Sequence, residues 1–392
     1  MRRALIGLSA TVAGVLVAAS ADAQGTIRIG IVLAYSGQFA DTAAQMDNAI
    51  KLYVKQHGDT VAGKKIEFIR KDVGGIAPPV AKRLSQELVV RDGVDVLAGY
   101  ILTPNALAGA DVSRDAKKFM VVMLGATSIV ITRSPYMART SFTVPQTNET
   151  LGEWIYRSGV RKVYTAVSDY AGGHDAEAAL HRAFKAAGGE IVGSVRWPVA
   201  NPDFAPFVQR MKDTNPEALY LWIPGGTQPA ALGKALAERG ISPQKTKVFG
   251  QDVLTDETAL KGMGEIALGI ITASHYDYNL KNAANQAFVK AYSDAYGRNP
   301  DIFSIGGWDG IHLIYEALKK TGGKTDGESL INAAKGMKWD SPRGPMWTDP
   351  DTRDVVQTIY IRRVEKVNGK LLNVEFDKVE NVKDPVNARP KQ

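Results

Sequence analysis

The chain has no cysteine among its 392 residues. Disulfide bonds and thiolate catalysis are therefore excluded, and cysteine usage gives no information about the cellular compartment. The sequence also lacks a Gly-x-Ser-x-Gly nucleophile elbow, a phosphate-binding P-loop and an intact Gly-x-Gly-x-x-Gly motif. These absences exclude the enzyme classes that depend on those motifs, and they favour binding over catalysis.

Histidine is also scarce, with five in the chain. His174, Glu177 and His181 recur at helical spacing in "HDAEAALH", so they could share one helix face and bind a metal. An exported metal-dependent enzyme is therefore one alternative. The other interpretation is a polar stripe on an amphipathic helix, because apolar residues occupy the opposite face.

Long apolar runs are absent except at the start of the chain. Arg2 and Arg3 precede an apolar run over residues 4–19, and Ala-Asp-Ala at 21–23 forms a small-x-small cleavage site. This order is typical of a secretory signal peptide, and the apolar run is shorter than the roughly 20 residues of a spanning anchor. We expect export and cleavage after Ala23.

Basic residues are not clustered, although the net charge is +7. They occur singly among acidic and polar residues, as in "QRMKDTNPE". A nucleic-acid site would gather Lys and Arg on one face. We therefore expect no nucleic-acid partner.

Strand-like and helix-like patterns alternate along the chain. Strand-like "KIEFIR", "VDVLAG", "KVYTAVS" and "EALYLWI" are separated by helical runs such as "PVAKRLSQELVVR" and "PAALGKALAERG". Residues 64–100 and 189–226 repeat one order of strand, Pro-bearing loop, helix and strand. The alternation predicts an α/β fold of two lobes with parallel-rich sheets.

The C-terminal third differs in pattern. Helices are expected near 283–296 and 305–319, followed by a hairpin of residues 355–367 and 370–376 with an Asn-Gly-Lys turn. We expect these segments to return into the two lobes.

Small and hydroxyl-bearing residues follow two strands of the first half. Thr103 stands where a helix begins, and its hydroxyl could join free backbone N–H groups in holding a carboxylate. "GATS" follows the next strand, where glycine and alanine let a ligand reach the backbone. The predicted first-lobe contacts are Tyr100, Leu102, Thr103, Gly125, Ala126 and Thr127.

The second half repeats this arrangement. "SDYAGG", "IPGGT" and "GQDV" each follow a predicted strand. Asp252 in the last of these could receive an ammonium group or cap the segment that follows it. The predicted second-lobe contacts are Tyr170, Ala171, Gly225, Gly226 and Asp252.

The opening "IRIGIVLAYSGQFAD", the second-half "SDYAGGHDAE" and the ending "SPRGPMWTDPDTRDVVQTIYI" together resemble one family. The chain resembles the periplasmic substrate-binding proteins of the leucine/isoleucine/valine-binding type, which serve ABC importers. The resemblance implies two Rossmann-like lobes joined by three crossings, near 144–147, 273–276 and 345–349. It places residues 24–145 and 276–346 in lobe 1, and residues 146–275 and 347–392 in lobe 2.

The resemblance also implies the ligand. In such proteins a hydroxyl matching Thr103 and a turn matching Gly125-Ala126-Thr127 hold a carboxylate, and an acid matching Asp252 holds an ammonium. A branched-chain or other neutral amino acid is the ligand expected first. Asp252 is one methylene shorter than the glutamate common at its position, so an aromatic carboxylic acid without an ammonium is the alternative. Whether the loop at Ser36–Phe39 contacts ligand is open.

The remaining expectations concern partners. The resemblance implies delivery of the ligand to a membrane permease of an ABC transporter, with no catalysis and no cofactor. We expect a monomer. A sensory ligand-binding module with the same cleft is a further alternative.

Overall fold

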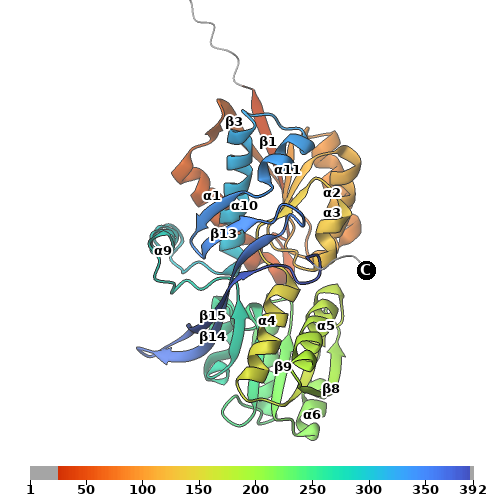
Figure 1. The fold of residues 1–392 in the computed structure, drawn as a ribbon, viewed down its shortest axis with the longest axis vertical. Coiled ribbons are helices and arrows are strands. Elements are labelled where there is room, and N and C mark those ends of the chain that lie inside the picture. Colours follow the sequence, from red (N-terminus) through yellow and green to blue (C-terminus); the bar gives the residue numbers. More distant parts are fainter. Residues whose placement is uncertain (1–24, 389–392) are drawn as a thin grey trace, which may run out of the picture.

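A computed structural model describes residues 25–388 as two α/β lobes, one above the other in Figure 1. The predicted signal peptide and its cleavage site after Ala23 lie outside the described residues. Each lobe is built around one sheet, and the β14–β15 ribbon runs from between the lobes along the lower one.

The first sheet has six strands in the order β2-β3-β1-β4-β5-β6, parallel except for the β2–β3 pair. β4 and β5 are buried along their whole length, as expected for parallel strands covered on both faces. The strands are β1 (Thr26–Leu33), β2 (Thr60–Val61), β3 (Lys64–Asp72), β4 (Val96–Gly99), β5 (Phe119–Val122) and β6 (Met137–Arg139).

The second sheet has nine strands in the order β12-β13-β14-β11-β10-β9-β7-β8, with β15 paired to β14. β7 to β11 run parallel, and β11 to β15 pair antiparallel. The strands are β7 (Lys162–Ser168), β8 (Glu190–Trp197), β9 (Ala218–Trp222), β10 (Lys247–Gln251), β11 (Ile271–Ser274), β12 (Lys338–Ser341), β13 (Gly344–Thr348), β14 (Val355–Val367) and β15 (Lys370–Val382).

Helices cover both sheets (Figure 1). The first lobe carries α1 (Ala40–His57), α2 (Pro78–Val90), α3 (Thr103–Ala116), α9 (Ala283–Tyr296), α10 (Ile302–Lys320), α11 (Gly327–Ala334) and the 3-10 helices η1 (Gly37–Phe39) and η2 (Ser128–Arg133). The second lobe carries α4 (Val144–Arg157), α5 (Ala171–Ala186), α6 (Ala205–Thr214), α7 (Gln228–Glu238), α8 (Glu257–Met263) and the 3-10 helices η3 (Asp252–Thr255) and η4 (Gly264–Ala267).

The C-terminal elements confirm the local predictions. α9 has the expected bounds, and α10 begins three residues early because Asp301 caps it, accepting from the backbone N–H groups of Phe303 and Ser304. The predicted hairpin is β14–β15. Its turn residues Asn368 and Gly369 both have positive φ, as an Asn-Gly turn requires.

The chain passes between the sheets three times. It leaves β6 for α4, returns from β11 to α9, which packs on α1 of the first lobe, and crosses again from α11 of the first lobe to β12 of the second sheet. The carboxyl ends of β1, β4 and β5 therefore face those of β7, β9 and β10. In open α/β sheets such ends hold ligands.

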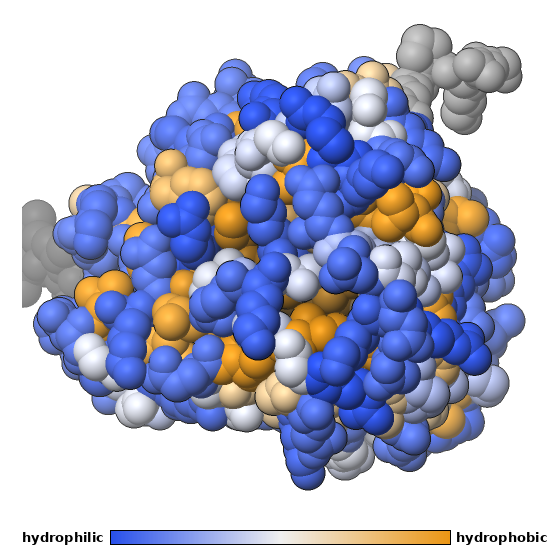
Figure 2. Space-filling view, turned by 90° about the horizontal axis from the view of Figure 1, so that it is seen from below, coloured by the Kyte–Doolittle hydropathy of each residue, from blue (hydrophilic) through white to orange (hydrophobic). Residues whose placement is uncertain are grey.

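Among residues 25–388, no helix has the length and apolar character that crossing a membrane requires. Hydrophilic residues predominate on the face shown in Figure 2, and the apolar residues there form separate patches.

Candidate functional site

A cavity of about 40 Å³ lies between the facing strand ends of the two sheets. Both lobes and the first crossing contribute to its wall, and most of the wall is apolar or aromatic. The lining residues are Ile101, Leu102, Thr103, Leu124, Ala126, Phe142, Val144, Tyr170, Gly172, Trp222, Pro224, Gln251 and Val253.

The β4–α3 turn supplies the first wall. Leu102 is extended, and Thr103 begins α3 with Pro104 in the first turn, where a missing N–H costs nothing. Thr103 is 5% exposed. Its hydroxyl therefore lies at the positive end of the α3 dipole, a position that favours an anion.

The turn after β5 lies beside this helix. A Cβ on Gly125 would be 2.9 Å from the Ala106 Cβ, so only glycine allows the close approach to α3. Buried Arg139 donates from Nη1 to the carbonyls of Gly125 and Thr127, 2.8 Å each. The Thr127 hydroxyl is buried without a hydrogen-bond partner among residues 25–388. Arg139 thus fixes a turn that retains an unused hydroxyl.

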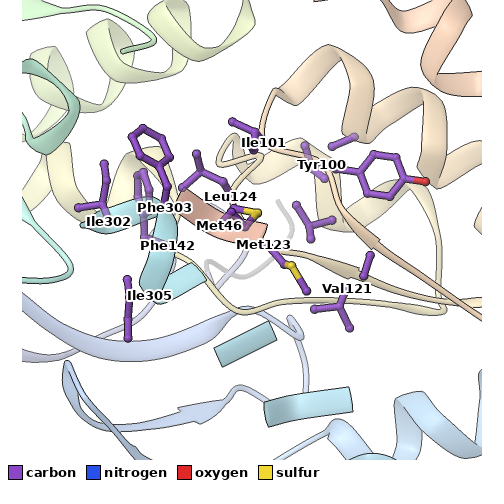
Figure 3. Packing of buried hydrophobic residues seen from close by; sticks show 14 of the residues in the cluster. Met46, Tyr100, Ile101, Val121, Met123, Leu124, Phe142, Ile302, Phe303 and Ile305 are labelled. Carbon is purple, nitrogen blue, oxygen red and sulfur yellow. The ribbon is translucent and has the colours of Figure 1, made fainter. Parts of the chain in front are cut away.

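Tyr100 is placed away from the cavity. Its ring points away from Leu124 and Phe142 (Figure 3), and its hydroxyl pairs with the Ser85 hydroxyl at 2.7 Å. Its φ is +59°, and its carbonyl accepts from the Gly125 N–H at 2.9 Å. The structure therefore gives Tyr100 a packing role, and it supports the turn through its backbone.

Aromatic rings form much of the second wall. The rings of Tyr170 and Trp222 lie 5.5 Å apart at 42°. A Cβ on Gly172 would be 2.7 Å from the Trp222 ring, so this glycine lets the ring lie against α5. Burial raises the pKa of the Tyr170 phenol, which stays protonated at neutral pH. Phe142 adds a ring from the first crossing and stacks on His275 at 4.5 Å.

Asp252 lies behind this wall, outside the cavity lining. Its Oδ1 accepts from the Val253 N–H (2.9 Å) and from Gln251, and its Oδ2 accepts from Ser274 and His275 at 3.0 Å each. Burial raises the pKa of Asp252, but the hydrogen bond from His275, the charge of Arg362 and the hydrogen bond from Ser274 outweigh it and hold the pKa below its ordinary value. The carboxylate is therefore ionised and already satisfied by protein donors.

The glycines after β9 allow the two lobes to lie close together. Gly225 and Gly226 have φ of +86° and +68°. A Cβ on Gly226 would be 2.6 Å from the Gln38 carbonyl oxygen in the Ser36–Phe39 loop. That loop therefore contacts the second lobe. Ala171 is exposed at the start of α5.

The three candidate metal ligands do not converge. His174 pairs with Asp169 at 2.6 Å, Glu177 accepts from Arg196 at 2.6 Å, and His181 pairs with Thr165 at 3.0 Å. Within residues 25–388, no group of three His, Cys, Asp or Glu side chains is arranged to hold a metal ion. Although the three residues are spaced to share one helix face, their side chains pair with other residues of the second lobe and form no joint site.

Comparison with known proteins assigns the family. Residues 26–370 match the family described as periplasmic binding protein. The chain is 38% identical over 371 residues to the Leu/Ile/Val-binding protein homolog 6 of Brucella melitensis biotype 1, covering 94% of this chain and 95% of that protein. The chain belongs to the periplasmic binding protein family.

Two solved structures resemble this periplasmic binding protein closely. A solute-binding protein of an ABC transporter from Rhodopseudomonas palustris BisB5, in complex with 3,4-dihydroxybenzoic acid, is 52% identical with a TM-score of 0.89. A second, from R. palustris with 4-hydroxybenzoate, is 36% identical with a TM-score of 0.90. This chain is covered to 92% and 93% respectively, and each of those chains to 99%. The predicted two-lobe fold is confirmed.

The cavity brings together part of the predicted set. Leu102, Thr103, Ala126 and Tyr170 line it. The other predicted contacts lie behind or beside the lining, and for all eleven residues ligand contact stays a prediction. These others are Tyr100, Gly125, Thr127, Ala171, Gly225, Gly226 and Asp252.

Nine of the thirteen lining residues of this periplasmic binding protein were not among the predicted contacts. Among them, Trp222 and Gln251 are the last residues of β9 and β10, and Phe142 lies between β6 and the predicted first crossing. Trp222 and Gln251 could have been found by counting the last residue of every strand as a candidate, whereas Phe142 lies three residues beyond its strand. Gly172 and Pro224 were quoted within the predicted turns but not chosen.

Proposed function

We propose that this chain captures an aromatic carboxylate between its lobes and delivers it to an ABC permease. The observation that carries the proposal is Asp252, whose two carboxylate oxygens are satisfied by Gln251, Val253, Ser274 and His275. A ligand ammonium would have to displace these donors, and among residues 25–388 no acid lines the cavity.

The rest of the wall supports an aromatic acid. Thr103 provides a donor at the N-terminus of α3 for a carboxylate, and the Thr127 hydroxyl beside the lining is buried without a partner among residues 25–388. Phe142, Tyr170 and Trp222 provide flat apolar surface for a ring. The Rhodopseudomonas proteins described above carry hydroxybenzoic acids, which supports the same ligand class.

The remaining parts of the proposal follow from this role. The chain is exported, is cleaved after Ala23, and acts as a monomer without nucleic acid. Binding involves no catalysis. Lobe closure excludes water from the ligand, and opening at the permease releases it.

Thermal unfolding of ligand-stripped protein tests the proposal. Benzoate and hydroxybenzoates at about 100 times their dissociation constants should stabilise the fold by about 2.7 kcal/mol, whereas leucine, isoleucine and valine should not. Thr103→Val keeps the shape and removes the hydroxyl, so it should weaken benzoate binding about tenfold. Thr103→Ser is the matched control and should retain binding. A response to the branched-chain amino acids alone would refute the proposal.

A further inference from the structure

The side-chain amide of Gln251 has only one possible orientation. The Trp222 indole is a donor only, and its Nε1 lies 2.5 Å from Gln251 Oε1. Asn148 Nδ2 donates to the same oxygen at 3.3 Å. On the other side, Gln251 Nε2 donates to Asp252 Oδ1 at 3.2 Å. Reversing the amide would place NH₂ against the indole N–H and a carbonyl against a carboxylate.

Asp252 is itself held in place. Its Oδ2 accepts from His275 Nδ1 and from the Ser274 hydroxyl, 3.0 Å each. Burial lowers the pKa of His275, so the ring is neutral at pH 7 and its one N–H serves this bond. His275 stacks on Phe142, a residue of the cavity wall. Donors and acceptors therefore have a fixed order from Trp222 through Gln251 and Asp252 to His275.

One hydrogen of the Gln251 amide is left over. The Nε2 group carries two hydrogens, and Asp252 accepts one. Among residues 25–388, the structure provides no acceptor for the second. Gln251 lines the cavity and is 1% exposed, so a bound ligand is the available source of an acceptor.

We propose that Gln251 selects, among aromatic carboxylates, those whose ring bears an oxygen acceptor, and that Asp252 and His275 are positioning residues that keep its N–H directed to the ligand. This inference rests on the proposed function. A ring hydroxyl can accept this hydrogen bond. A methyl group cannot, and an aromatic amine presents N–H donors and a delocalised lone pair.

Calorimetric titration with matched ligands tests this. Hydroxy-, methyl- and aminobenzoates substituted at ring positions 3 and 4 are similar in size. At one position at least, the wild type should bind the hydroxy acid about tenfold tighter than the other two. In Gln251→Met the three should bind alike.

Tyr170→Phe tests the competing assignment, because it removes the side-chain hydroxyl of the second wall and keeps the ring. If Gln251 selects, this variant should still bind the hydroxy acid more tightly than the methyl acid, whatever its overall affinity. A preference that survives in Gln251→Met but disappears in Tyr170→Phe would overturn the inference and assign selection to Tyr170.

The positioning role has its own test. In Asp252→Asn the remaining oxygen still accepts from Gln251, while His275 changes tautomer and Ser274 rotates to meet the new NH₂ group. This variant should keep the preference. Asp252→Ala removes the acceptor that holds the Gln251 amide. This variant should therefore lose the preference for the hydroxy acid while still binding methylbenzoate. If Asp252→Ala fails to fold, Asp252→Asn and Gln251→Met still test the inference. Loss of the preference in Asp252→Asn would contradict the positioning role.

The outcomes separate the two proposals. Equal wild-type affinity for hydroxy, methyl and amino acids at both ring positions would overturn the role of Gln251 and leave aromatic-acid capture intact. Failure of every aromatic acid to bind the wild type would overturn the proposed function, and this inference with it.

Discussion

Gly226 sets how closely the two lobes approach each other. It has φ of +68°, and a Cβ there would lie 2.6 Å from the Gln38 carbonyl oxygen of the first lobe. Gly240 has φ of +69° with no atom within 4 Å of its Cβ position. Comparing alanine substitutions at Gly226 and Gly240 therefore separates the effect of backbone strain from the effect of steric contact between the lobes.

Gly226→Ala should weaken binding of a hydroxybenzoate about tenfold, because the added methyl keeps the lobes apart. Both Gly226→Ala and Gly240→Ala should lower the free energy of unfolding by about 1–2 kcal/mol, the cost of a left-handed alanine. Calorimetric titration and chemical denaturation measure the two effects. Equal binding by both variants would show that the Gly226–Gln38 approach is irrelevant to the ligand.

At the residue scale, the sequence predicts which positions lie at the cavity better than it predicts which groups hydrogen-bond to one another there. Thr103 and Ala126 were predictable because small and hydroxyl residues after a strand are a local pattern. The sequence could not predict that protein donors occupy the Asp252 carboxylate. Two of these donors, Ser274 and His275, lie more than 20 positions away and reach it only in the folded sheet. The position of Gln251 at the end of a strand was predictable, but the orientation of its amide was not, because Trp222, 29 positions away, fixes it.

At the scale of elements, α4 begins where the chain first crosses between lobes. Thr143 and Gln146 form a capping box: the Thr143 hydroxyl accepts from the Gln146 N–H at 3.2 Å, and Gln146 Oε1 accepts from the Thr143 N–H at 2.8 Å. Gln146 Nε2 also donates to the carbonyls of Val355 and Val382. The cap thus joins the first crossing to β14 and β15.

Thr143→Ala should lower the free energy of unfolding by about 1 kcal/mol, because one helix N–H loses its acceptor. Thr143→Ser retains the hydroxyl and should restore most of the loss. Urea denaturation of the three proteins gives the comparison. A Thr143→Ser variant as unstable as Thr143→Ala would indicate that the methyl group, rather than the cap, carries the stability.

Elements were predicted well where the signal was local. The β14–β15 hairpin follows from alternating apolar residues around Asn-Gly, and α9 from its apolar spacing. The pairing of β12 and β13 with β14 was not predicted, although the three strands follow one another along the chain, because β12 and β13 have only four and five residues and give a weak strand pattern.

At the scale of the whole molecule, Asp175 connects the lobes. It lies on α5, and its Oδ2 accepts from the Ser128 N–H of η2 in the first lobe at 3.2 Å. Burial raises the pKa of Asp175 to about 6; the bond from Ser128 opposes this, and nearby Asp384 adds to it. The folded protein therefore binds this proton more tightly than the unfolded chain, whose carboxyl has an ordinary pKa near 3.8.

A raised carboxyl pKa favours the folded state at low pH, and this contribution is lost as the pH rises through about 6. The free energy of unfolding of the wild type, relative to that of Asp175→Asn, should therefore fall between about pH 4 and pH 7. Asparagine keeps an oxygen for Ser128 and does not titrate. Denaturation series of both proteins across this range measure the difference, and parallel curves would contradict the assignment.

The two-lobe architecture follows from the alternation of strands and helices, whereas the choice of ligand depends on contacts made only when the lobes meet. The most direct measurement is competition: ligand-stripped protein is offered equimolar leucine and 4-hydroxybenzoate, and the bound molecule is identified by mass spectrometry after gel filtration. Retention of 4-hydroxybenzoate alone is the predicted result. Retention of leucine would contradict the account and require Asp252 to exchange its protein donors for an ammonium.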